Sequence, residues 1–78
     1  MNIEEVKIYG YPAIIHHDKK IGLYTICSLE DGGAIVSSKY RNNAIISFKN
    51  AMDLVKSIFV ANQMKLVALY LQLSLVYL

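Results

Sequence analysis

The sequence predicts an α+β domain, in which a three-stranded antiparallel meander is covered by one helix and completed by a C-terminal strand. Three observations support this prediction. Residues 6–46 are rich in β-branched and aromatic side chains interrupted by turn signals, residues 47–63 change to helical periodicity, and the last ten residues alternate. We expect residues 1–78 to form a single small domain, because this length leaves no room for a second one.

The composition indicates that this domain needs a partner surface. Hydrophobic residues make up 55% of the chain and charged residues 18%, against roughly 45–50% and 25% in an ordinary soluble domain. A chain of this size buries only about 60% of the surface that it exposes when unfolded. Cys27 is the only cysteine, so no internal disulfide supplements the core. We therefore expect a protein partner and a homo-oligomer, most simply a dimer.

The net charge and the N-terminal sequence bear on which partners and which cell compartment to expect. The net charge of +2 is small and the basic residues are dispersed, so a nucleic-acid partner is not indicated. The start MNIEEVK has no basic region followed by an apolar stretch, so we expect no secretory signal. The lone thiol of Cys27 is expected to pack as a small hydrophobe on a strand, which fits a reducing, cytoplasmic setting.

The first strand region is VKIYGYPAIIHH, residues 6–17. Pro12 lacks the amide that a strand ladder uses, so it predicts an edge strand, a bulge or a strand that begins near Pro12. The polar turn HDKKIG then leads to the second strand, GLYTICSLE, at residues 22–30.

The strongest turn signal is EDGG, residues 30–33. An Asp-Gly or Gly-Gly step between apolar runs predicts a tight primed hairpin turn, which needs positive φ at both central residues. The returning strand is AIVSSKY, residues 34–40, and the turn formers Asn42 and Asn43 end it.

Residues 47–63 predict an amphipathic helix, with the hydroxyl of Ser47 at the N-cap. Residues 44–47, AIIS, fit either a short strand or the entry into this helix. One face of the helix is apolar, and it consists of Phe48, Ala51, Met52, Val55, Ile58 and Phe59. The opposite face carries Lys49, Asp53, Lys56 and Gln63. The apolar face first fails at Asn62 and Gln63, where we expect the helix to end.

The tail, residues 66–77, has three interpretations. As a membrane segment it is short, because a span needs about 20 apolar residues and extending it backwards takes in Lys65. As an extension of the helix it would be apolar on almost all sides and would require oligomerisation. As a strand it alternates, with Leu69, Leu71, Leu73, Leu75 and Tyr77 on one face. The alternation favours the strand, about residues 66–77, over the helix extension.

No residue set predicts a catalytic or metal site, and no cofactor is expected. His16, His17 and Asp18 are the one cluster of metal-ligand types, but neighbouring residues on a strand point to opposite faces. GLY at residues 22–24 and IVS at residues 35–37 are similar to the paired strand motifs of GIY-YIG nucleases, in which an arginine such as Arg41 would complete the site. The second motif here lacks its Tyr and Gly, and no glutamate follows Glu30. We therefore predict a non-enzyme, with a degenerate GIY-YIG-like nuclease as one alternative.

A second resemblance covers residues 11–78. YPAII, the hairpin into GLYTI and the helix SFKNAMDLVKSI resemble the core of HicB-type antitoxins, which have a partial ribonuclease H-like fold. The segment SLEDGG replaces that family's Pro-Asp-x-Pro-Gly, and the DNA-binding domain of many members is absent. The resemblance implies a protein that binds a small toxin or enzyme and blocks it, without recognising DNA itself.

We therefore expect a small non-catalytic interaction protein that sequesters or inhibits a macromolecular partner. The alternative is a membrane-associated protein anchored by its apolar C-terminus. Exposed sheet edges and the tail are the expected contact surfaces, through addition of a strand at an open edge. The candidate partner-binding residues are Tyr70, Gln72, Ser74 and Val76 on the outer face of the tail, followed by Tyr24 and Tyr40.

Overall fold

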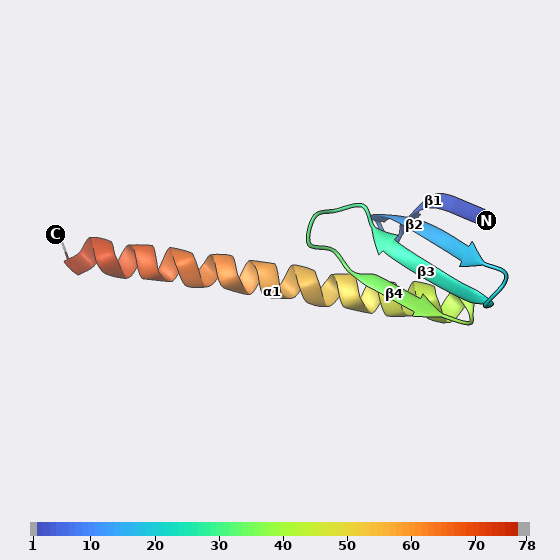
Figure 1. The fold of residues 1–78 in the computed structure, drawn as a ribbon. Helices are drawn as coiled ribbons and strands as arrows, with labels where there is room; N and C mark the ends of the chain where they lie inside the picture. Colours follow the sequence, from blue (N-terminus) through green and yellow to red (C-terminus); the bar gives the residue numbers. More distant parts are fainter. Residues whose placement is uncertain (1, 77–78) are drawn as a thin grey trace.

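A computed structural model of the chain describes residues 2–76, which form one antiparallel sheet and one long helix (Figure 1). The elements in chain order are β1 (Asn2–Ile8), β2 (Tyr11–Asp18), β3 (Leu23–Ser28), β4 (Ile35–Ser38) and α1 (Arg41–Val76). The four strands lie in the sheet in that same order, as a meander. The α+β class and the antiparallel meander are confirmed, with four strands in place of the three predicted.

The additional strand arises from a hairpin turn at Tyr9 and Gly10. Their φ angles are 51° and 87°, and two central residues with positive φ make the primed turn that suits the twist of a two-residue hairpin. The predicted first strand is therefore two strands, with Ile8 paired to Tyr11 across the turn. Pro12 is the second residue of β2, as expected for a strand that begins there, and its carbonyl oxygen accepts a hydrogen bond from the Leu29 amide at 3.0 Å.

The EDGG segment forms a longer loop, residues 29–34, so the prediction of a tight two-residue turn there is wrong. Only Gly32 has positive φ, at 74°. The loop closes through backbone bonds from Ser28 to the Ala34 oxygen at 3.0 Å and from Gly33 to the Glu30 oxygen at 3.1 Å. A Cβ atom at Gly33 would overlap the Ser28 side chain, which explains why a second glycine follows the first.

Helix α1 begins at Arg41, six residues before the predicted cap at Ser47. Asn42 and Asn43 lie inside its first turn, so they do not form a separate turn. The Tyr40 carbonyl accepts the first helical bond, from the Ala44 amide at 3.0 Å. Ala44 is completely buried, and this packing against the sheet outweighs the weak helix propensity of asparagine.

The helix continues without interruption to Val76, so the prediction of a C-terminal strand is wrong and its alternative, the helix extension, is confirmed. Leucine is among the best helix formers, and the tail has few of the β-branched residues that favour strands. Tyr77 and Leu78, the end of the predicted strand, lie outside the described residues.

The core lies between one face of the sheet and the first half of α1. Phe48 is completely buried and Met52 is 3% exposed, in contact with a cluster that includes Ile8, Ile15 and Ile26. The predicted apolar helix face is therefore confirmed at these positions. The expectation that this face covers the sheet is wrong further along, because Ile58 and Phe59 lie beyond the sheet and are more than half exposed.

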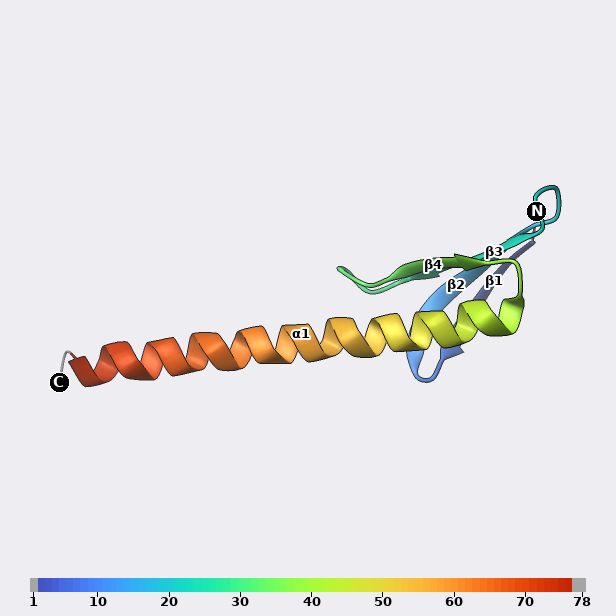
Figure 2. The ribbon, with the colours of Figure 1, turned by 90° about the horizontal axis from the view of Figure 1, so that it is seen from below.

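The molecule is elongated, with extents of 64 × 19 × 17 Å. Figure 2 shows that α1 lies against one face of the sheet only and then continues far past it. We call residues 41–55 the anchored half of the helix and residues 56–76 the projecting segment.

Candidate interaction surface

The projecting segment exposes large apolar side chains along its length and over most of its circumference. Every described side chain from residue 56 to residue 72 is exposed. Eight of the large apolar ones have exposed fractions between 47% and 69%, and they are Ile58, Phe59, Val60, Met64, Leu66, Val67, Leu69 and Leu71. Monomeric soluble proteins rarely expose so much contiguous apolar surface, and such patches mark sites of interaction.

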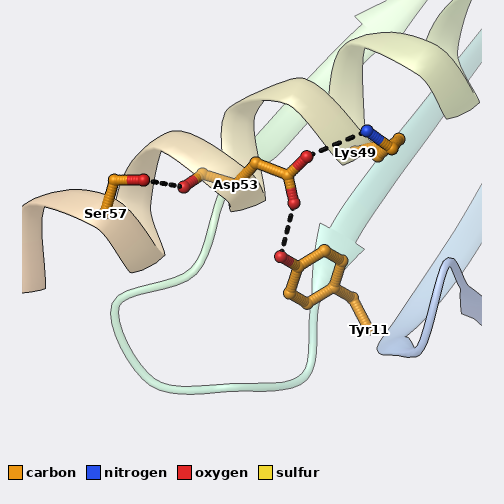
Figure 3. Close-up of polar contacts among 4 residues, drawn as sticks. All are labelled: Tyr11, Lys49, Asp53 and Ser57. Atoms are coloured by element: carbon orange, nitrogen blue, oxygen red, sulfur yellow. Dashed lines mark hydrogen bonds and ion pairs between the residues drawn. The ribbon is translucent and has the colours of Figure 1, made fainter. Parts of the chain in front are cut away.

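A polar cluster holds the helix at the point where it leaves the sheet (Figure 3). Tyr11 on β2 donates a hydrogen bond to Asp53 Oδ1 at 2.6 Å, and Lys49 donates to Oδ2 of the same carboxylate at 2.9 Å. Ser57 Oγ donates to the Asp53 carbonyl oxygen at 3.0 Å, one turn further along. Asp53 thus connects the β1–β2 hairpin to the last turn of the anchored half.

The same bonds shift two pKa values in opposite directions. The pKa of Asp53 is lowered, first by the hydrogen bond from Tyr11 and then by the bond from Lys49, because both stabilise the carboxylate. The pKa of Tyr11 is raised, first by that bond to Asp53, which favours the protonated phenol, and then by desolvation. Both groups face solvent, so the cluster fixes geometry without forming a buried charged site.

A cleft of about 660 Å³ opens beside this cluster, between the β1–β2 turn and the β3–β4 loop. Its floor is apolar, formed by Met52, Val55 and Phe59, and its loop side carries the carboxylates of Glu30 and Asp31. The Ala34 amide donates to Met52 Sδ at 3.2 Å, which ties the β3–β4 loop to the helix. The cleft lies at the point where the apolar helix face passes from sheet cover into solvent.

The second face of the sheet has no helix over it (Figure 2). Alternation along the paired strands places Ile14, Cys27 and Ile35 in one row on this face. Ile35 is 72% exposed, and Cys27 is half-buried on β3, so the thiol is less covered than expected. The two edges of the sheet are β1 and the four-residue β4.

The histidines lie on opposite faces of β2, as the alternation rule predicts. His17 stacks on Tyr24 with ring centroids 4.0 Å apart, whereas His16 is on the open face and its Nε2 atom is buried without a hydrogen-bond partner. Within the described part of the chain, no three His, Cys, Asp or Glu residues gather in a way that would hold a metal ion.

The structure separates the predicted partner-binding residues. Gln72 is exposed on the projecting segment, whereas Tyr40 is 68% exposed beside the start of α1. Tyr24 is half-buried under His17. The other three positions, Tyr70, Ser74 and Val76, lie on the helix backbone, with side chains outside the described set. Alternate residues of a helix differ by about 200° around its axis, so the four tail positions do not share the single face expected of a strand.

Arg41, the candidate nuclease arginine, forms an ion pair with Glu4 at 2.8 Å. Both side chains are about half exposed, and the pair connects the first turn of α1 to the edge strand β1. This contact gives Arg41 a structural role that is independent of any catalytic one.

Within residues 2–76, no helix is both long enough and apolar enough to cross a membrane. Comparison of the chain with protein-family models, with curated proteins and with solved structures gives no match. The resemblances to HicB-type antitoxins and GIY-YIG nucleases therefore stay predictions that rest on the quoted residues.

Sequence reasoning did not select the apolar side chains that the projecting segment exposes most. Phe59 was expected on the apolar face of the helix that covers the sheet, and Met64 and Leu66 were not singled out. The available signal was the length of the apolar helical pattern compared with the short strands, which predicts that a continuous helix must extend past its sheet.

Proposed function

We propose that the chain is a non-catalytic interaction protein that binds and sequesters a macromolecular partner, and that the projecting segment is its main contact surface. The observation that carries this proposal is the set of eight large apolar side chains, each about half or more exposed, along residues 58–71. Water excluded from these side chains on binding supplies the driving force. The two sheet edges provide a second, hydrogen-bonding mode of contact.

The proposal includes an antitoxin-like or other inhibitory role, in which the partner is a small toxin or enzyme. The Tyr-Pro-Ala start of β2 and a helix that follows an antiparallel meander support this role, whereas the final strand that the HicB-type resemblance implies is absent from residues 2–76, where the helix continues instead. An inhibitor of this kind needs a contact surface held in a fixed orientation and does not need catalytic residues. The Asp53 cluster fixes the direction in which the helix leaves the sheet.

Affinity capture with three purified chains tests the proposal. The first is wild type, and the second carries Met64→Asp and Leu71→Asp on the projecting segment. The third is a control with Ser47→Asp and Asn50→Asp, two exposed positions of the anchored half. We expect the wild type and the control to retain the same partner and the projecting-segment variant to lose it. Retention of the same partner by all three chains would show that the projecting segment is not the contact surface.

A further inference from the structure

The line of apolar residues on α1 keeps the same helical spacing from the core into the solvent-exposed part of the helix. Phe48 and Met52 pack under the sheet, and positions at alternating steps of three and four residues extend the same line past it. We call this line from Val55 onward the seam, and it consists of Val55, Phe59, Asn62, Leu66 and Leu69. The seam contains no charged residue, and Asn62 is its one polar member.

This spacing has the 3.5-residue period of helices that pack against other helices. The sheet covers the first half of the line, where Phe48 is completely buried, and nothing in the described chain covers Phe59 or Leu66, which are 60% and 66% exposed. We propose that the seam pairs with the seam of a second copy of this chain, in an antiparallel arrangement of the two helices.

The available area fits a dimer of this kind. The overlap from Val55 to Val76, the end of the described helix, covers about 33 Å at 1.5 Å per residue. A helix pair of this length spans about three heptads, with four contacting positions in each. At roughly 60 Å² per position, each copy would bury roughly 700 Å² of solvent-accessible surface. Stable protein interfaces bury about 800 Å² per partner, so one second copy is enough.

The antiparallel direction follows from the sheet. On the seam side, the anchored half of α1 is already covered by its own strands, and a parallel partner would bring its own sheet into the same space (Figure 2). An antiparallel partner approaches from the free end and places its sheet beyond Val76. Its last turns then reach the cleft over Met52, Val55 and Phe59, whose apolar floor they cover.

The composition of the segment also favours a second copy over a charged partner. Residues 57–76 contain one charged side chain, Lys65, and no carboxylate. A strongly charged partner would find no complementary charge along the seam, whereas two seams present the same apolar surface to each other. Lys65 lies at the border of the seam, where its ammonium group stays in water.

This inference is independent of the proposed function, because a purified chain that fails to self-associate can still bind a different partner. Sedimentation of the purified chain from 1-fold to 100-fold dilution is expected to show a dimer that dissociates on dilution. Leu66→Asp with Leu69→Asp should give a monomer at all concentrations, and Met64→Asp with Leu71→Asp, on the other side of the helix, should leave the dimer intact. Circular dichroism confirms that each variant is folded.

Distances between spin labels then test whether the two helices run antiparallel. The labels are attached in a Cys27→Ser background, so that only the introduced cysteine is labelled. The overlap is centred between Lys65 and Leu66, so labels at Lys65→Cys should lie within about 20 Å of each other, whereas labels at Asn50→Cys should lie about 45 Å apart. Short distances at both positions would show a parallel pair and overturn the arrangement. A wild-type monomer that enters neutral lipid vesicles, or equal dissociation by both aspartate pairs, would overturn the seam itself.

Discussion

The two halves of α1 carry the same apolar pattern in opposite surroundings. In the anchored half the pattern is buried, with Phe48 at 0% and Met52 at 3% exposure, whereas in the projecting segment Phe59 and Leu66 are exposed by 60% and 66%. Periodicity therefore tells which face of a helix is apolar, but the length of the sheet decides how much of that face is covered. A six-residue strand such as β3 is about 20 Å long, and a 36-residue helix is about 54 Å long.

The largest expected difference between the halves is between their two phenylalanines. Phe48→Ala should lower the free energy of unfolding by about 3–5 kcal/mol, because it empties a fully buried site. Phe59→Ala should change it by less than about 0.5 kcal/mol when the chain is diluted to a monomer. Urea unfolding followed by circular dichroism measures both values. Similar losses in the two variants would mean that Phe59 is packed within the monomer.

A smaller difference is expected between two methionines. Met52→Leu keeps the side-chain volume but removes the sulfur that accepts from the Ala34 amide, so it should cost about 1 kcal/mol of stability. Met64→Leu, on the exposed projecting segment, serves as the matched control and should leave the monomer unchanged. Equal urea midpoints for the two variants would show that the sulfur contact contributes nothing.

The smallest expected effect concerns the boundary between the halves. Because the pKa of Asp53 is lowered on folding, the contribution of Asp53 to the free energy of unfolding is present above about pH 4. This contribution is lost as the pH falls through the lowered value. The raised pKa of Tyr11 makes its contribution present below about pH 10 and lost as the pH rises through the raised value. Both effects should be small, since the groups are exposed to solvent.

Asp53→Asn tests this pH dependence. The stability difference between wild type and Asp53→Asn should shrink as the pH falls below 4, in unfolding curves measured from pH 2 to pH 7. Asp31→Asn, on the exposed β3–β4 loop, is the control for loss of a carboxylate. A wild-type advantage that persists undiminished at pH 2 would rule out the carboxylate form of Asp53 as its source.

The sequence predicted the class and the meander because β-branched runs and turn residues are local signals. It missed the turn at Tyr9, where a non-glycine residue takes positive φ, and it expected a tight turn at Gly32 and Gly33, where the chain forms a longer loop. It also placed the helix start too late, because asparagines at positions 42 and 43 resemble a turn. In each case, packing against the sheet or pairing of the strands overrode the local preference.

The prediction of a C-terminal strand was wrong for a different reason. Leucines at every second position indicate a strand, but a strand of this length needs a neighbouring strand along its whole course, and nothing local reports whether one is present. The helix satisfies its own backbone hydrogen bonds, so it needs no neighbour for them. The candidate surface was only partly predictable, because exposure of Phe59 or Leu66 depends on where the sheet ends and not on the residues around them.

The unbroken helix has a consequence for how changes in chain length act on the molecule. Each residue added to the helix after Lys56 rotates everything beyond it by about 100° and shifts it by 1.5 Å. Insertion of a single alanine after Lys56 would leave the sheet and its core untouched and would turn the seam from Phe59 onward away from the cleft and out of line with Val55. Insertion of seven alanines, about two full turns, would bring the seam back to its original face. The length of the helix therefore sets the angle between the sheet and whatever the far end of the helix binds.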